Sequence, residues 1–343
     1  YPTPDGPYNP LNSPNEYSGL ITAREALTHS KNTGAFLVED KIGLKTGISY
    51  GEKLGLKYNS ASKTSIAALA LGQVNNSPTD RDGGNTFILA SAYGTFGNYG
   101  MYTKPILYSK VVDATGKTLL NNTSPKQTKV FSPQAAYILY DMLKGPVNEY
   151  NATGARWGNM PISGKTGTTT NSTDLWFAGL SPYLSGSVWI GYDKPDKLIG
   201  SSSGCASLWG KLMAKAHEGL EVKEIEAPSN GIVKVNVCKD SGLIPSSLCS
   251  ADPRGSRVIE EMFIEGTEPK ETCSTHVTAN VNRFSNKLVD SSSIFTQSRV
   301  YIEKDHPNSA TAAYPYVLPS TFDLTTTEQP VTENTGETPP VTT

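Results

Sequence analysis

The sequence is poor in features that would place it among nucleic-acid-binding or membrane-spanning proteins. Its 30 Lys and Arg residues are scattered and balanced by 32 Asp and Glu, so it lacks the clustered basic footprint of a nucleic-acid-binding protein. The longest apolar run, Ile66 to Leu71, is far shorter than the roughly 20 residues that a membrane-spanning helix needs. No signal peptide opens the chain. The Pro-rich start at Tyr1 resembles the interior of a longer polypeptide, so we expect secretion or anchoring signals upstream.

Residues that bind metals are also scarce. The chain has four cysteines and four dispersed histidines, and the cysteine spacings match no common zinc pattern. We therefore predict no metal and no cofactor. Three of the cysteines fall in one late segment, where a disulfide is plausible, and a remaining one would serve as a small buried hydrophobe. The four are Cys205, Cys238, Cys249 and Cys273.

The 343 residues can bury a full core and are enough for more than one domain. Residues 1–220 contain clear helix and strand signals. They close with an amphipathic pattern whose apolar face carries Leu208, Leu212, Met213 and Ala216. Residues 221–318 contain short strands and turn signals without a strong helix, which predicts a small β-rich domain. Residues 319–343 are mainly Thr, Pro and Glu, which predicts a disordered tail.

The chain is organised around the stretch from Ser163 to Asp193. Two apolar, aromatic segments in it, 175–181 and 187–192, are separated by Pro and Gly, which predicts an antiparallel strand pair. Just before them, Lys165 lies beside the hydroxyl groups of Thr166 and Thr168, and Gly167 allows a ligand to approach the backbone closely. This combination of a cation and hydroxyl groups suits a carboxylate.

The same Gly-Lys-Thr string invites comparison with a phosphate-binding loop. That motif requires a glycine at position 159, which is asparagine here, and Gly158 misses by one position. The loop also needs a following helix whose N-terminus faces the phosphates, whereas a Thr-rich, strand-like run follows Lys165. A nucleotide site is therefore disfavoured.

A second group of polar residues lies at a predicted helix junction. Thr22 and Glu25 form a capping box, which predicts a short helix over 23–29, and Thr33 can cap a second helix. Ser30-Lys31-Asn32 interrupts the two helices. Residues at such a junction belong to neither helix face, so they can present their side chains to a cleft.

The two groups together resemble the serine penicillin-recognising enzymes. That family carries Ser-x-x-Lys, Ser-x-Asn and Lys-Thr-Gly motifs in this order around one cleft. Longer blocks resemble class A penicillin-binding proteins over residues 1–220 and, more loosely, to His276. These blocks are Thr22-Ala-Arg-Glu-Ala-Leu-Thr-His-Ser-Lys-Asn, Ala90-Ser-Ala-Tyr-Gly-Thr-Phe-Gly-Asn-Tyr-Gly, Gly164-Lys-Thr-Gly-Thr-Thr, Asp174-Leu-Trp-Phe-Ala-Gly and Val188-Trp-Ile-Gly-Tyr-Asp. The resemblance implies an α/β (α+β) serine β-lactamase/transpeptidase-like fold, with an antiparallel sheet flanked by helices and a small β-rich C-terminal domain.

One departure from the family pattern is serious. The only Ser-x-x-Lys in the sequence, Ser60 to Lys63, follows Ser30, whereas the family's nucleophile precedes the second motif. We interpret Ser60 as a helix-start or loop serine and expect the nucleophile on a segment upstream of Tyr1, so residues 1–343 alone should be inactive. A second Lys-Thr-Gly, at Lys45, lies between helical segments and is interpreted as a helix cap.

By resemblance, each motif residue has a role. The absent serine attacks a D-Ala-D-Ala carbonyl and forms an acyl-enzyme that an amine resolves. Ser30 would relay protons while Lys165 keeps the network positive, and Asn32 would bind the substrate amide. The remaining residues would receive the terminal carboxylate and the oxyanion: Thr166, Gly167 and Thr168, with the backbone N–H of Thr168 as one oxyanion donor.

The resemblance implies a peptidoglycan D,D-transpeptidase at the outer face of a bacterial cytoplasmic membrane. Its partners would be peptidoglycan stem peptides and a lipid-linked precursor, with β-lactams as covalent inhibitors, and a glycosyltransferase domain and a membrane anchor would lie upstream. A D,D-carboxypeptidase or β-lactamase, which uses water as the acceptor, remains open. So does a non-catalytic module that binds cell-wall peptides.

Overall fold

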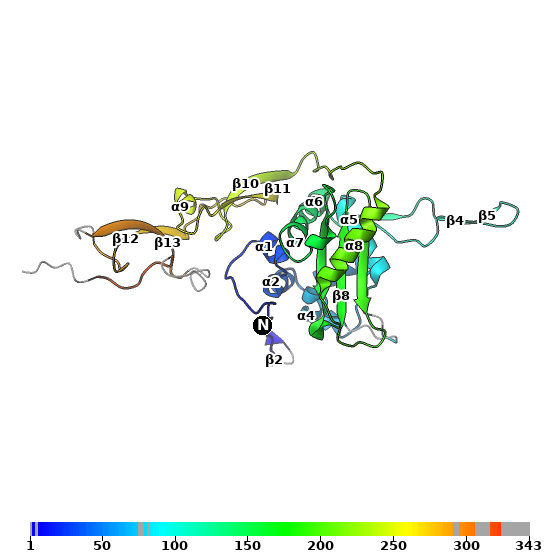
Figure 1. The fold of residues 1–343 in the computed structure, drawn as a ribbon, viewed down its shortest axis with the longest axis horizontal. Coiled ribbons are helices and arrows are strands. Elements are labelled where there is room, and N and C mark those ends of the chain that lie inside the picture. Colours follow the sequence, from blue (N-terminus) through cyan, green and yellow to red (C-terminus); the bar gives the residue numbers. More distant parts are fainter. Residues whose placement is uncertain are drawn as a thin grey trace, which may run out of the picture. The chain divides into compact units, whose positions relative to one another are not determined.

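The computed structural model describes residues 2–3, 6–74, 79–80, 82–290, 295–305 and 316–323 (Figure 1). The chain forms two compact units, which are Tyr1–Asn236 with Glu260–Pro269 and Val237–Ile259 with Lys270–Thr343. The tail predicted to be disordered lies outside the described residues from position 324 onward. Its first part is described, and Phe322 there bridges Leu288.

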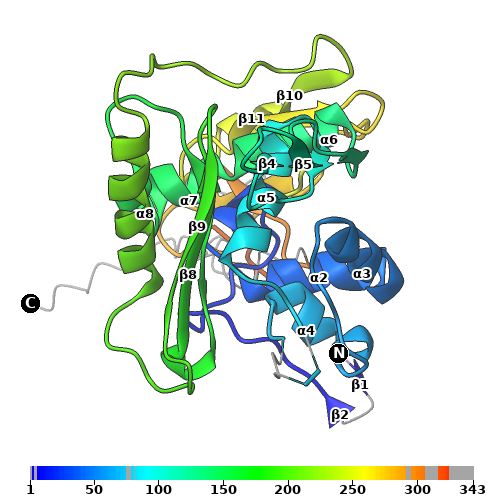
Figure 2. The same cartoon turned by 90° about the vertical axis from the view of Figure 1, so that its right-hand side faces the viewer.

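A three-stranded antiparallel sheet forms the centre of the first unit, which confirms the predicted antiparallel pair. Its strands are β7 (Ser163–Thr168), β8 (Asp174–Leu180) and β9 (Ser185–Gly191), in the order β7-β8-β9. Helix α8 (Ser202–Ala216) lies along one face of this sheet, and α5 (Thr86–Gly97) lies on the other (Figure 2). The predicted arrangement of a sheet flanked by helices is therefore present.

Helix α8 packs through a face that overlaps only in part with the predicted one. Met213 is buried as predicted, whereas Ala216 is exposed. Trp209 is 2% exposed and its ring lies 5.2 Å from that of Phe177 on β8, whereas Leu208 and Leu212 are 43% and 57% exposed. The prediction for the two leucines was wrong because small residues at the adjoining positions allow the helix to approach the strands closely. A Cβ at Gly210 would lie 2.6 Å from the Gly154 carbonyl oxygen. Close approach, rather than hydrophobicity alone, therefore sets the buried face.

The opposite face is completed by helices that follow α5 in the chain. Ser132 caps α6 (Pro133–Met142) by accepting a hydrogen bond from the N–H of Ala135, and α7 (Lys144–Glu149) follows. Tyr140 of α6 is fully buried with Leu180 of β8. This second core fixes β8 from the side that α8 does not cover.

Short helices dominate the N-terminal part of the first unit. The Lys45-Thr46-Gly47 string lies inside α3, whose N-cap is Gly43, so its predicted position between helices as a cap was wrong. None of the helices in the described residues combines the length and the apolar character that a membrane crossing requires. The helical elements are α1 (Ala23–Thr28), α2 (Asn32–Ile42), α3 (Leu44–Lys53), η1 (Ser62–Thr64), α4 (Ile66–Leu71), η2 (Thr153–Ala155) and η3 (Thr170–Ser172). The short strands are β1 (Pro2–Thr3), β2 (Gly6–Pro7), β3 (Met101–Thr103), β4 (Lys110–Val112), β5 (Thr118–Asn121) and β6 (Gln127–Lys129).

The last part of the chain is built mainly of strands, as the turn signals predicted. Its elements are β10 (Ile232–Cys238), which pairs with β11 (Val258–Ile264), the short helix α9 (Ser247–Ser250), and the antiparallel pair β12 (His276–Asn282) and β13 (Thr296–Ile302). All four cysteines of the chain are free thiols, so the suggested disulfide is not formed in the structure.

Candidate active site

The two predicted motifs meet in the first unit. Lys165 Nζ donates a hydrogen bond to Ser30 Oγ at 2.8 Å, across 135 positions of sequence. The same ammonium group donates to the carbonyl oxygen of Thr166 at 2.9 Å. A strand lysine and a serine at a helix junction thus form one polar contact, as the family resemblance led us to expect.

Ser30 is held in a backbone conformation that serine rarely adopts. Helix α1 ends in a Schellman motif, in which the N–H of Ser30 donates to Leu27 O and the N–H of Lys31 donates to Ala26 O. Ser30 occupies the left-handed position of this motif, with φ at 53°. Glycine is the usual residue there, and a side chain costs about 1–2 kcal/mol. A serine kept at this position indicates that its hydroxyl group has a use.

Lys165 lies in surroundings that disfavour its charge. Burial lowers the pKa of its ammonium group to about 8. Within the described part of the chain, no carboxylate forms an ion pair with it. The site is therefore electropositive at neutral pH and lacks an internal anion, which leaves it suited to a ligand's carboxylate.

The lowered pKa of Lys165 predicts a pH-dependent stability. Between about pH 8 and the ordinary lysine value, the unfolded chain keeps a proton that the folded chain has lost, so the free energy of unfolding rises with pH. The full rise is about 3 kcal/mol. Lys165→Met should lack this rise, whereas a variant of an exposed lysine, Lys117→Met, should keep it. Urea unfolding at about pH 7 and about pH 10 measures the free energy of unfolding of both variants. An equal change of this free energy with pH in the two variants would contradict the prediction.

Asn32, the predicted ligand of the substrate amide, already has a hydrogen-bond partner within the chain. Asn32 begins α2, and its side-chain amide donates to Leu11 O at 2.7 Å. The N–H of Thr33 donates to Asn12 Oδ1, so Asn12, rather than Thr33, caps this helix. The prediction that Thr33 caps α2 was therefore wrong, because the segment before α1 crosses the start of α2 and supplies the cap.

Thr166 and Thr168 differ in accessibility. Thr166 lies opposite Phe177 in the register of β7 and β8, and Phe177 packs on α8. The Thr166 hydroxyl donates to Asn151 Oδ1 at 3.0 Å. It is 7% exposed. Thr168 is exposed at the end of β7. Only Thr168 presents its side chain to solvent.

The two glycines of β7 have different reasons to be glycine. A Cβ at Gly164 would lie 2.4 Å from Phe177 Cζ, so internal packing forbids a side chain. A Cβ at Gly167 would meet only Trp176 Cβ, at 3.4 Å. Internal packing therefore explains Gly164 and not Gly167. Because β7 is an edge strand of its sheet, a small residue at 167 leaves that edge open to a ligand.

Ser60 and Lys63 belong to another part of the first unit. They lie at η1, where Lys63 Nζ forms an ion pair with Glu52 Oε1 at 2.8 Å. Ser60 is exposed. A lysine paired with a carboxylate is a poor base for a neighbouring serine, which supports the interpretation of Ser60 as a loop residue.

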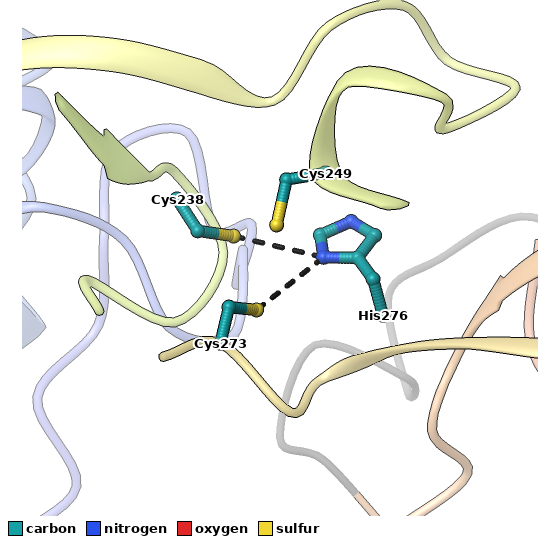
Figure 3. A group of neighbouring side chains, drawn as sticks. All are labelled: Cys238, Cys249, Cys273 and His276. Carbon is teal, nitrogen blue, oxygen red and sulfur yellow. Dashed lines mark hydrogen bonds between the residues drawn. The ribbon is translucent and has the colours of Figure 1, made fainter. Parts of the chain in front are cut away.

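One group of side chains was missed from the sequence. Three of the four cysteines, Cys238, Cys249 and Cys273, lie together with His276 (Figure 3). The only local signal was the two-residue spacing between Cys273 and His276. Cys238 and Cys249 come from other segments of the chain, so no local spacing rule finds them.

Two family models match the chain. The penicillin-binding protein transpeptidase domain matches residues 1–197, and the penicillin-binding protein 1A C-terminal domain matches residues 228–278. Penicillin-binding protein 1A of Clostridium perfringens is 50% identical over 80% of this chain, and that of Aquifex aeolicus is 32% identical over 77%. The chain spans 33% and 34% of the length of these two relatives.

Solved structures of low identity share the fold. Penicillin-binding protein 1A of Haemophilus influenzae matches with a TM-score of 0.62 at 24% identity, over 78% of this chain and 43% of that one. PonA1 of Mycobacterium tuberculosis in complex with penicillin V matches with a TM-score of 0.54 at 22% identity, over 64% of this chain and 62% of that one. The predicted transpeptidase-like fold is thereby confirmed.

Proposed function

Because this chain belongs to the penicillin-binding proteins with a transpeptidase domain, we propose that it forms most of an acyl-transfer site that crosslinks peptidoglycan stem peptides. The observation that carries this proposal is the hydrogen bond between Lys165 and Ser30. This bond places the Lys165 ammonium group beside the Ser30 hydroxyl group, and the backbone of Ser30 adopts the strained left-handed conformation at this position. Such a pair can pass a proton to a leaving group while the surroundings stay positive.

The proposed nucleophile is a serine on a segment other than residues 1–343. Lys63, the lysine of the single Ser-x-x-Lys string in the sequence, forms an ion pair with Glu52. The matched part of this chain covers only about a third of each relative's length, so the relatives have ample room for a preceding motif. In this proposal the serine attacks the D-Ala-D-Ala carbonyl, the C–N bond to the terminal D-Ala breaks, and Ser30 delivers a proton to the departing amine. A second stem peptide's amine then displaces the serine.

Substrate binding is proposed to use the open edge of β7. Thr168 offers an exposed hydroxyl and a backbone N–H at the end of the strand, and Gly167 leaves room beside it. We assign the ligand carboxylate and the oxyanion to this position. The Thr166 hydroxyl would have to break its hydrogen bond to Asn151 before it could bind a ligand. The Asn32 amide nitrogen donates to Leu11, so only its side-chain oxygen would be available to the substrate.

The surrounding organisation is also proposed from the family. Residues 221–318 would form a C-terminal module separate from the catalytic domain, which the second family match at 228–278 supports. An upstream glycosyltransferase domain and a membrane anchor would place the site on the outer face of a bacterial cytoplasmic membrane, with lipid-linked precursors as partners and β-lactams as covalent inhibitors.

Fluorescent penicillin tests the proposal. A full-length protein that includes residues 1–343 should be labelled covalently at a serine outside this segment, whereas residues 1–343 alone should stay unlabelled. Peptide mapping of the labelled protein identifies the serine. Labelling at Ser60, or failure of the full-length protein to label, would overturn the proposal; the second result would instead favour a binding module.

An amine acceptor distinguishes transfer from hydrolysis. With a stem-peptide donor and an amino-acid acceptor, a transpeptidase yields crosslinked product in addition to free D-Ala. Release of D-Ala without crosslinked product would identify a carboxypeptidase, and hydrolysis of penicillin with rapid turnover would identify a β-lactamase.

A further inference from the structure

Four metal-ligating side chains meet in the interior of the second unit. Cys238, Cys249, Cys273 and His276 are at most 5% exposed, and their ligand atoms all lie within 4.8 Å of one another (Figure 3). We propose that these four residues bind one structural zinc ion. The proposal concerns the fold of this unit and does not depend on the acyl-transfer reaction.

The spacing of the ligand atoms fits a tetrahedral zinc ion. His276 Nδ1 lies 3.6 Å from Cys238 Sγ and 3.6 Å from Cys273 Sγ. A tetrahedral ion with ordinary Zn–S and Zn–N bonds separates a sulfur from a nitrogen by about 3.6 Å. The two sulfur–nitrogen distances are equal, as expected for side chains that surround one ion. A direct N–H···S hydrogen bond would instead bring the nitrogen closer to one sulfur than to the other.

The histidine is oriented as a metal ligand. Its Nε2 lies 3.0 Å from Asp252 Oδ2, and an ionised carboxylate can only accept, so Nε2 carries the proton. In a neutral imidazole this leaves Nδ1 with a bare lone pair, and Nδ1 is the nitrogen that faces the sulfurs (Figure 3). A carboxylate behind a ligating histidine is the arrangement that fixes its tautomer at zinc sites.

The carboxylates behind His276 are held by arginines and are not themselves a second cation site. Arg254 pairs with Asp252 at 2.8 Å and with Asp240 at 3.0 Å, and Arg257 pairs with Asp240 at 2.9 Å. Two guanidinium groups already balance the two carboxylates. They therefore support the histidine rather than bind an ion of their own.

The position of the cluster explains why this small unit would need an ion. Cys238 ends β10, Cys249 lies in α9, and Cys273 and His276 lie together at the start of β12, so one ion would join three segments. The hydrophobic side chains packed around the three cysteines are only Leu243 and Val258 among the described residues. Four protein ligands leave no open coordination position, which indicates a structural and not a catalytic ion.

Metal content and cobalt spectroscopy test the proposal on the intact chain. Residues 1–343 purified without chelator should carry about one zinc per molecule, and Co²⁺ exchanged into the protein should show the thiolate charge-transfer and tetrahedral d–d bands of a Cys₃His site. Cys249→Ser should lose the zinc or weaken the charge-transfer band. Cys205→Ser is the matched control, because Cys205 is also a free, buried cysteine but lies in α8; it should retain both.

Three outcomes would overturn the proposal. The first is protein without zinc whose mass shows the loss of two hydrogens through a disulfide among the three cysteines. The second is a cobalt spectrum without thiolate bands, which is independent of whether any variant folds. The third is stoichiometric iron in place of zinc.

The carboxylate behind the histidine supplies a finer test. Asp252→Asn should weaken zinc affinity by about 10–100-fold in competition with a chromogenic chelator, because the orientation and basicity of His276 depend on it. Glu303→Gln removes an exposed carboxylate from the same unit and should leave the affinity unchanged. Chelation should also expose the β12 and β13 amides to hydrogen exchange. An unchanged affinity in Asp252→Asn would contradict the assigned role of Asp252.

Discussion

Lys165→Met should slow acylation of the full-length protein by penicillin by about 10²–10⁴-fold, the range expected when a positioned proton-transfer group is lost. Methionine is unbranched and only one atom shorter than lysine, but it cannot donate to Ser30 or hold a positive charge. Its uncharged side chain suits the buried position that lowers the pKa of Lys165 to about 8. The loss should therefore arise from chemistry and not from unfolding. The second-order rate of labelling with fluorescent penicillin measures it.

The second Lys-Thr-Gly string provides the matched control for that variant. Lys45 occupies the same local sequence but is exposed in α3, so Lys45→Met should label at the normal rate. If both lysine variants label normally, Lys165 does not serve the reaction. If both fail, the loss cannot be assigned to the contact with Ser30.

Ser30→Gly separates the hydroxyl group from the backbone that carries it. Glycine is the preferred residue at the left-handed position of the Schellman motif, so the free energy of unfolding should rise by about 1 kcal/mol. Labelling should nevertheless slow, and Ser30→Gly combined with Lys165→Met should be little worse than Lys165→Met alone, because the two residues act as a unit. A glycine variant that labels normally would remove Ser30 from the proposed proton path.

The sequence predicted those parts of the fold that local rules control. The capping box at Thr22 and Glu25 places α1, and Thr22 does accept from the N–H of Glu25. The apolar segments behind Lys165 pair as predicted because aromatic and branched residues and a turn signal between them mark both strands. The meeting of Ser30 and Lys165 was expected from the resemblance to the penicillin-recognising enzymes, whose motifs line one cleft.

Features that depend on tertiary packing were not predictable in this way. The cap of α2 comes from Asn12, about twenty positions away, and α8 buries Trp209 in place of its neighbouring leucines. The cysteine and histidine cluster joins three segments, and only Cys273 and His276 are close in sequence. In each case the residue that completes the contact lies in another segment of the chain, so a local sequence pattern cannot predict it.

The largest expected effect on stability belongs to Phe177. Its side chain is fully buried, and its ring packs edge-on against Trp209 at 5.2 Å. It also fills the space above Gly164, where a Cβ would lie only 2.4 Å from Phe177 Cζ. Removing the ring leaves a cavity between β7, β8 and α8 that their packed backbones cannot close. Phe177→Ala should therefore lower the free energy of unfolding by about 3–5 kcal/mol.

Trp189→Ala is the control for Phe177→Ala, because it removes a larger ring from the neighbouring strand β9 at a site that is 37% exposed. Its loss should lower the free energy of unfolding by about 1 kcal/mol or less, since little of the vacated space becomes a cavity. All four tryptophans lie in the first unit, so tryptophan fluorescence during urea unfolding reports on this unit alone. If Trp189→Ala destabilises as much as Phe177→Ala, the sheet is not anchored through α8. If only Phe177→Ala destabilises, the strand that carries Lys165 owes its position to the aromatic contact behind it.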